Sequence, residues 1–288
     1  MASKILFSNV ITPDSVKNLY MQLGVTLPGR VAVKVHSGEP GNQNFLGPEY
    51  WKPVTELVGG TVVECNTAYE GGRHNARVHR QTLERHGWSR TFTVDLLDAE
   101  GPDWELPVPG GKVIRKNFVG KDLKNYDSLL VLSHFKGHPM GGFGGALKQL
   151  SIGVASSYGK AYIHGAGDAD VSFNADHDSF LMSMADAASA VVDYFKGNLA
   201  YISVMKNLSV DCDCCADAEL PCMKDIGILA SLDPIAIDQA AIDLVYAAKD
   251  DPGQAHFIER VESRNGILTV EAAAAHGFGS REYELIEV

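Results

Sequence analysis

The sequence has few basic residues: Lys and Arg number 25 against 36 Asp and Glu, giving a formal net charge of -11. Nucleic-acid and anionic-membrane contacts need clustered basic side chains, so this balance argues against both kinds of partner. No apolar run reaches the ~18 residues that cross a bilayer. The opening MASKILFSNV becomes polar too early for a secretory signal, and we therefore predict a cytoplasmic protein.

Cysteine is also scarce, and its distribution is uneven. The chain has five cysteines, and four of them lie in VDCDCCADAELPC, residues 210–222. A disulfide framework would spread its cysteines along the chain, so the clustering predicts reduced thiols. The spacing C-x-C-C-x6-C matches neither a zinc ribbon nor a ferredoxin-type motif, and no ferredoxin-type cluster is expected.

Hydrophobic residues make up 45% of the 288 residues, enough for a sizeable core. Short apolar runs of strand length alternate with longer helical segments. Residues 127–133, DSLLVLS, form a continuous apolar run of the kind buried on both faces in a parallel sheet. We predict an α/β fold with a mainly parallel sheet flanked by helices, in one domain over residues 1–288. The polar stretch 98–111 is the expected place for any boundary between two lobes.

Proline and aspartate positions predict how two helices begin. The segment DPIAIDQAAIDLVYAAK starts with Asp233 as the N-cap and a proline at the first helical position. Asp238 is expected to lie on the surface of this helix. The segment GPEYWKPVTELVGG suggests a helix after Pro48, which Pro53 is expected to interrupt or to restrict to short turns.

The cysteine-rich segment is also acidic, and this combination predicts a metal site. Its members are Asp211, Cys212, Asp213, Cys214, Cys215, Asp217, Glu219 and Cys222. Crowded thiolates and carboxylates raise one another's pKa, and a divalent cation between them would remove the repulsion. Thiolates favour a soft ion such as zinc or iron. A loop of inert thiols with solvated acids is the alternative interpretation.

A glycine-rich segment, SHFKGHPMGGFGGALKQL, follows the predicted buried strand. Parallel-sheet enzymes place ligands beyond the carboxyl ends of their strands, where His134, Lys136 and His138 fall, so we predict catalytic roles for these three. The predicted ligand-binding glycines are Gly141, Gly142, Gly144 and Gly145. A helix from about Ala146 would offer unpaired N–H groups to a small anionic ligand or cofactor. A flexible turn whose glycines solve a packing problem is the alternative.

Two further segments are candidates for the same edge of the sheet. Lys34 and His36 lie near the end of one predicted strand, and Arg73 follows the end of the next. Arg73 could clamp a carboxylate or phosphate, or it could merely open a surface helix. Lys160 and His164 either lie at this same edge of the sheet, or they are a solvated lysine and a hydrogen-bonded histidine without a functional role.

The segments KVHSGEP, YEGGRHN, SHFKGHPMGGFGGALKQLSIG, VDCDC and DIGILASLDPIAIDQAAIDLV together resemble an uncharacterised family. Its members are commonly labelled iron–sulfur centre proteins and are otherwise called a domain of unknown function. The resemblance spans about residues 31–245. Many members carry an inserted ferredoxin-like module, but here the cysteine-free HGAGDADVSFNADHDSF occupies that place.

The resemblance narrows the predicted metal ligands. Asp211, Cys212, Asp213 and Cys214 match the DCDC block of the family, and the resemblance implies that the two cysteines hold the ion, with histidines as co-ligands. Cys215 and Cys222 fall outside the pattern.

We therefore expect a metal-assisted or redox-related protein that acts on a small anionic molecule at the carboxyl edge of the sheet. One alternative is an electron-relay or binding protein whose cluster module is lost or is supplied by a redox partner. Another is a metal-free enzyme with a cysteine thiolate beside a histidine.

Overall fold

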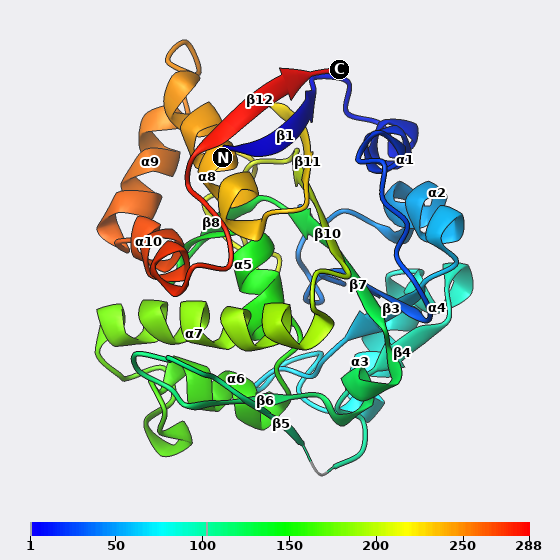
Figure 1. Ribbon diagram of the computed structural model, residues 1–288, viewed down its shortest axis with the longest axis vertical. Helices are drawn as coiled ribbons and strands as arrows, with labels where there is room; N and C mark the ends of the chain where they lie inside the picture. The colour runs from blue at the N-terminus through cyan, green and yellow to red at the C-terminus, as the bar shows by residue number, and fades with distance from the viewer. Residues whose placement is uncertain (1, 102) are drawn as a thin grey trace.

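The computed structural model describes residues 2–101 and 103–288, and a sheet of eight strands lies at its centre (Figure 1). The strand order is β12-β1-β11-β10-β7-β2-β3-β4. The strands are β1 (Ser3–Ser8), β2 (Val31–Lys34), β3 (Thr61–Glu64), β4 (Val94–Leu96), β7 (Ser128–His134), β10 (Leu199–Met205), β11 (Gly227–Ser231) and β12 (Tyr283–Glu287). Neighbours run parallel except where β11 pairs with β1 and β10. The predicted α/β fold with a mainly parallel sheet is confirmed.

Helices cover both faces of the sheet. One layer holds α1 (Pro13–Gln22), α2 (Pro48–Val58), α3 (Ala76–Arg85) and α4 (Trp88–Thr91). The other holds α5 (Ala146–Lys148), α6 (Ser157–His164), α7 (His177–Phe195), α8 (Pro234–Ala247), α9 (Gln254–Ser263) and α10 (Ile267–His276). Figure 1 shows the first layer on the right and α7 to α10 on the left. A cluster of buried apolar side chains fills the space between each layer and the sheet.

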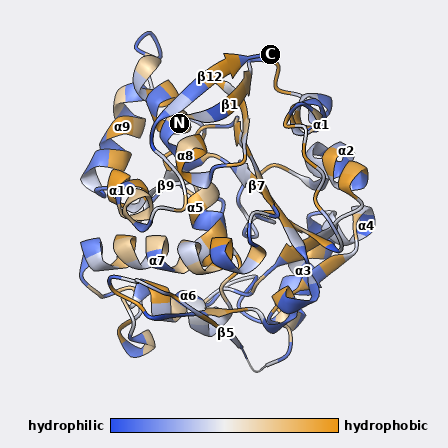
Figure 2. Ribbon diagram, in the orientation of Figure 1, coloured by the Kyte–Doolittle hydropathy of each residue, from blue (hydrophilic) through white to orange (hydrophobic). Residues whose placement is uncertain are grey.

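The position of β7 in the sheet explains the continuous apolar run at its centre, residues 129–132. Leu130 and Leu132 pack in the cluster beneath α1 to α4, whereas Leu129 and Val131 pack in the cluster on the opposite face. Side chains alternate between the two faces of a strand, so a strand that is covered on both faces needs an apolar residue at nearly every position. Figure 2 shows this continuous hydrophobic run along β7, whereas α2 alternates between hydrophobic and hydrophilic residues.

Two short antiparallel ribbons lie outside the main sheet. Strand β5 (Trp104–Pro107) pairs with β6 (Lys116–Val119), and β8 (Lys136–His138) pairs with β9 (Gly142–Gly144). Strand β5 lies within the stretch 98–111, of which residue 102 is outside the described residues. A lobe boundary in this stretch stays a prediction, as does the single domain.

The two proline-based helix predictions have different outcomes. Asp233 caps α8 as expected, because its carboxylate accepts the N–H groups of Ile235 and Ala236 at 2.9 and 3.0 Å. The expected interruption at Pro53 is wrong, since α2 runs through it without a break. Trp51, Val54 and Thr55 bury one face of α2, and this packing outweighs the single backbone hydrogen bond that a proline removes.

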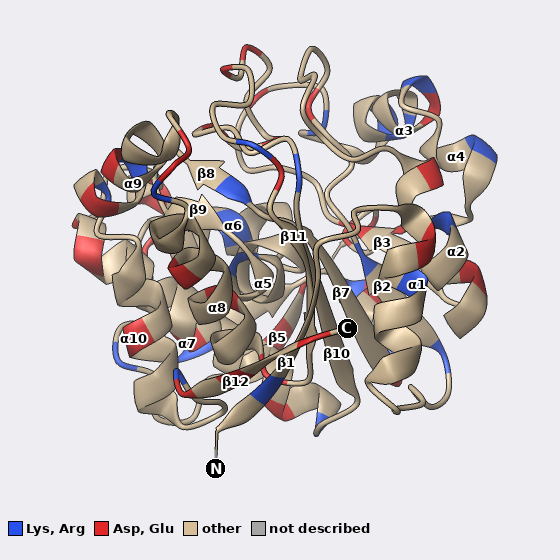
Figure 3. Cartoon of the chain, turned by 90° about the horizontal axis from the view of Figure 1, so that it is seen from above, with Lys and Arg blue, Asp and Glu red and all other residues tan. Residues whose placement is uncertain are grey.

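Lys, Arg, Asp and Glu residues lie mainly on the helices and loops around the sheet, as Figure 3 shows. No helix in the described part of the chain combines the length and the apolar character that a membrane crossing requires. Location in the cytoplasm stays a prediction.

Candidate functional site

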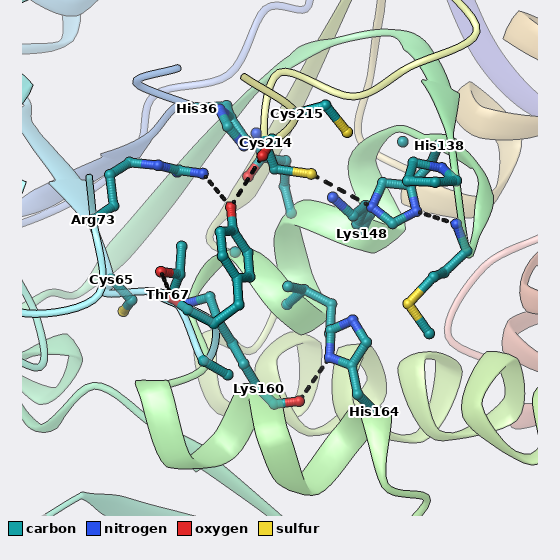
Figure 4. Close-up of a pocket in the computed structure, with 18 of the residues that line it drawn as sticks. His36, Cys65, Thr67, Arg73, His138, Lys148, Lys160, His164, Cys214 and Cys215 are labelled. Atoms are coloured by element: carbon teal, nitrogen blue, oxygen red, sulfur yellow. Dashed lines mark hydrogen bonds between the residues drawn. The ribbon is translucent and has the colours of Figure 1, made fainter. Parts of the chain in front are cut away.

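A cavity of about 290 Å³ lies at the carboxyl edge of the sheet. Its lining includes Lys34 from the end of β2, Glu64 from the end of β3, and His138 from the ribbon that follows β7. These strands are neighbours and parallel, so their carboxyl ends deliver side chains to one place. Figure 4 shows the side chains that surround this space.

Three potential metal ligands meet at one wall of the cavity. One ligand atom from each of His138, Cys212 and Cys214 lies within 4.8 Å of the other two. Cys214 lines the cavity, with its Sγ 3.9 Å from Nε2 of His138, whereas Cys212 is fully buried. This group could hold a metal ion. It contains both cysteines of the predicted metal site and one of the predicted catalytic residues.

Lysine side chains compensate for negative charge on this group. Nζ of Lys148 donates a hydrogen bond to Sγ of Cys212 at 3.4 Å. Burial raises the pKa of the Cys212 thiol, but a hydrogen bond from Cys214 and the ammonium groups of Lys148 and Lys136 outweigh it and hold the pKa well below its usual range. Hydrogen bonds with Cys212 and Cys215, together with burial, raise the pKa of Cys214. Cys212 is therefore the thiolate of the pair and Cys214 the thiol.

Backbone N–H groups determine which ring nitrogen carries the proton in His36 and in His138. Nδ1 of His138 accepts hydrogen bonds from the N–H groups of Met140 at 3.2 Å and Gly141 at 2.8 Å. Nδ1 of His36 accepts the N–H group of Gly38 at 3.1 Å. Burial lowers the pKa of both rings to about 4, so they are neutral at pH 7. A neutral ring that accepts at Nδ1 carries its proton on Nε2, which in His138 faces Cys214.

The acidic residues of the cysteine-rich segment have partners of their own. The Asp213 carboxylate contacts Nδ1 of His134 at 3.0 Å and Nζ of Lys136 at 2.9 Å. Asp211 pairs with Arg260 at 2.9 Å. Burial raises the pKa of Asp213, but His134 and Lys136 outweigh it and lower the pKa. The structure thus places both carboxylates outside the His138–cysteine group, and basic side chains neutralise them.

The glycine-rich segment forms the β8–β9 ribbon instead of an open loop. Gly144 and Gly145 line the cavity. The expectation of unpaired N–H groups at the following helix is wrong, because the N–H groups of Ala146 and Leu147 donate to Asp238 at 2.7 and 2.9 Å. Asp238 is fully buried, so its expected position on the helix surface is wrong as well. A protein carboxylate already occupies the place that an anion was expected to take.

Arg73 lines the cavity, but carboxylates of the protein hold its guanidinium group. Its Nε donates to Glu39 at 2.9 Å, and its Nη1 lies 3.9 Å from Glu64. Its Nη2 donates to the hydroxyl of Tyr69 at 3.0 Å. Although burial opposes it, the surrounding oxygen atoms raise the pKa of Arg73, so the group stays charged. Arg73 therefore positions the Tyr69 segment beside the cavity.

Sequence reasoning missed several residues of the cavity. Lys148 and Gln149 lie near the end of the glycine-rich segment, and the sequence prediction did not include them, although a lysine at that position is itself a signal for anion binding. Glu64 was missed too, and it pairs with the buried Lys34 at 2.6 Å. Lys160 and His164 do reach the cavity, as one of the two interpretations proposed.

The fold and the cavity define an α/β protein with a cysteine- and lysine-rich site at the carboxyl edge of its sheet. The chain belongs to the family described as a domain of unknown function, DUF362, which matches residues 31–243. No curated protein matches it.

Two solved structures are distantly similar to the chain. The lactate racemase apoprotein from Thermoanaerobacterium thermosaccharolyticum is 13% identical with a TM-score of 0.39, over 69% of this chain and 50% of that one. A protein from Thermotoga maritima is 12% identical with a TM-score of 0.43, over 91% of this chain and 58% of that one. The chain thus spans only about half the length of these proteins, and the similarity carries no inference about function.

Proposed function

We propose that the protein is an enzyme that acts on a small anionic molecule in the cavity, with a soft metal ion at Cys212, Cys214 and His138. The observation that carries this proposal is the convergence of these three side chains, two of which, His138 and Cys214, line a cavity that is also lined by lysines. Zinc or iron suits sulfur and imidazole ligands. Such an ion would supply Lewis-acid chemistry to a ligand in the cavity.

The donor set fits a soft ion through its sulfur atoms. Cys212 is already held as a thiolate by Lys148, and Cys214 would release its proton on binding the ion. Nε2 of His138 could bind the ion only if the ring proton moved to Nδ1, and the two backbone N–H groups that point at Nδ1 oppose this tautomer. We therefore assign the main contribution to the two cysteines.

Elemental analysis of the purified full chain tests this proposal. We expect about one equivalent of zinc or iron per chain, and loss of most of it in the Cys212→Ser/Cys214→Ser variant. Cys222→Ser is the matched control, because its thiol bonds to the carbonyl of Leu208 and lies outside the ligand group. Absence of metal, or equal metal in wild type and the double variant, would overturn the proposal.

An absorbance spectrum of the same sample tests the electron-relay alternative that the resemblance to iron–sulfur centre proteins raises. A brown protein with broad visible absorption would favour a cluster shared with a redox partner. A colourless, zinc-loaded protein would favour the enzyme.

A metal-free thiolate enzyme is the second candidate. The single ring proton of His138, on Nε2, faces Sγ of Cys214, and the ammonium group of Lys148 faces Sγ of Cys212, which suits a stabilised thiolate. Alkylation of metal-free protein with iodoacetamide, mapped by mass spectrometry, tests it. Labelling of Cys212 or Cys214 well before Cys222 would support this candidate, and equal rates would count against it.

A further inference from the structure

Lys160 differs from the other basic residues of the cavity in the bonds that it makes. Each of the others has an acidic partner within bonding distance: Lys34 with Glu64 at 2.6 Å, Arg73 with Glu39 at 2.9 Å, Lys136 with Asp213 at 2.9 Å and Lys148 with Cys212 at 3.4 Å. Lys160 is only 8% exposed, and its Nζ donates to the carbonyl of Ala155 at 2.6 Å. Within residues 2–101 and 103–288 it forms no ion pair.

The nearest carboxylate does not satisfy this ammonium group. Asp98 lies close enough to Lys160 to interact with its charge, but its oxygen atoms accept the backbone N–H groups of Asn66 and Ser157 at 2.9 Å. An ammonium group has three protons to donate, and the Ala155 carbonyl takes one. The remaining protons of Lys160 are available to a ligand in the cavity.

Gln149 offers a second unsatisfied group in the same cavity. Its side chain is 6% exposed and lines the cavity, and its amide has no hydrogen-bond partner in the described part of the chain. The amide is not sealed away from solvent, so it is free to donate an N–H to a polar ligand in the cavity. Gln149 lies in the π-helical turn Gln149–Gly153, which shortly precedes the helix that carries Lys160.

Much of the remaining lining is apolar. Met140, Ile152 and Phe173 contribute to it, together with Ala68 and Pro139. The volume of about 290 Å³ falls at the lower end of the ~300–1,000 Å³ that small-molecule sites occupy. A ligand that fits must therefore be small, with an apolar body and one charged end. One uncompensated ammonium group matches the single charge of a carboxylate better than the ~-2 of a phosphate.

We propose that Lys160 and Gln149 form the carboxylate-binding subsite of the cavity, and that the ligand is a small monocarboxylic acid with an apolar body. The Lys160 ammonium group neutralises the carboxylate, and the Gln149 amide donates a second hydrogen bond. This inference rests on the proposed function, because it assumes that the cavity is the substrate site. It replaces the glycine-rich segment and Arg73 as the anion-binding groups.

Isothermal titration calorimetry on the purified full chain tests the subsite with benzoate as the probe. Benzamide has the same shape without the charge, and inorganic phosphate carries charge without an apolar body. We expect benzoate to bind at least about ten times more tightly than either. Lys160→Met keeps the length of the side chain and should weaken benzoate binding about tenfold or more, whereas the exposed Lys124→Met should leave it unchanged.

Three results would overturn the subsite: equal affinity for benzoate and benzamide, tighter binding of phosphate, or unchanged benzoate affinity in Lys160→Met. If Lys160→Met does not fold, Gln149→Met decides the matter, with an expected loss of about threefold or more. The Cys212→Ser/Cys214→Ser variant should still bind benzoate. If the wild-type protein binds benzoate but contains no metal, the proposed metal site fails and the subsite stands. If it contains metal but binds no benzoate, the subsite fails and the metal site stands.

Discussion

Asp238 illustrates how a single buried carboxylate shapes the wall of the cavity. It bonds to the first two N–H groups of α5, which would otherwise be unpaired. Gly145 allows this close approach, because a Cβ atom there would lie 2.2 Å from Oδ1 of Asp238. The carboxylate thereby fixes the residues that lead into Lys148 and Gln149.

Replacing Asp238 by Asn should raise the free energy of unfolding by about 1–2 kcal/mol at pH 7, because a neutral amide avoids the cost of burying a charged carboxylate, and this gain exceeds the loss of one of the two hydrogen bonds. Urea unfolding followed by circular dichroism measures the change. Asp193→Asn on the exposed face of α7 is the matched control and should stay within about 0.5 kcal/mol of wild type. Equal effects of the two substitutions would contradict the role assigned to Asp238.

The sequence predicts residues of the site where a local rule applies. It does not predict them where a hydrogen-bond partner that is distant in the sequence determines the role of the residue. The rule that ligands lie at the ends of parallel strands placed His138 and Lys34 at the cavity. The partner of Ala146 is 92 residues away in sequence, and Arg73 is held by Glu39, which is 34 residues away. Nothing in the local sequence shows that carboxylates of the protein already bind these groups. Nor does it show that the ammonium group of Lys160 has protons without an acceptor among the described residues.

At the scale of elements, α2 contains a proline that local propensity does not tolerate. Pro48 occupies the first turn, where its missing N–H group costs little, but Pro53 lies one and a half turns further on. The helix persists because its buried face packs against the sheet and α1. It therefore retains a local defect that substitution can remove.

Pro53→Ala should raise the free energy of unfolding by about 1–3 kcal/mol, because alanine restores a backbone donor and removes a steric clash. Pro13→Ala is the matched control: Pro13 begins α1, where the N–H group has no helical partner. We expect that control to be neutral or slightly destabilising. Urea midpoints of the two variants give the comparison, and a less stable Pro53→Ala would show that the ring itself contributes packing.

The elements that sequence reasoning identified are the ones with a continuous or capped pattern. Strand β7 contains the continuous apolar run of residues 129–132, and α8 begins with Asp233 followed by proline. The local sequence does not indicate the ribbon β8–β9, because its strands are three residues long and rich in glycine. Such short strands form through tertiary contacts, which propensity does not report.

At the scale of the whole molecule, the burial of four histidines, three of which line the cavity, links stability to pH. Burial lowers the pKa of His79 and His164 to about 3 and that of His36 and His138 to about 4. The unfolded chain binds these protons near the ordinary pKa of ~6.5. Between the two values the unfolded state holds more protons, so the free energy of unfolding falls as the pH is lowered through this window.

Asp238 acts in the opposite direction, because burial raises its pKa to about 7. Its folded state gains a proton on acidification before the unfolded state does, so this residue stabilises the protein as the pH falls from 7 toward 4. Between pH 7 and pH 5.5 each histidine removes about 1 kcal/mol, and Asp238 returns about 1.5 kcal/mol. The stability lost through the four histidines therefore exceeds the stability gained through Asp238 as the pH falls.

We therefore expect a net loss of about 2–3 kcal/mol of stability between pH 7 and pH 5.5, measured by urea unfolding at both values. His164→Gln removes one buried imidazole and should reduce this loss by about 1 kcal/mol. His256→Gln is the matched control, because that ring is exposed, and it should keep the wild-type difference. Equal losses in His164→Gln and wild type would show that His164 gains its proton without unfolding, which requires water to enter the cavity beside it.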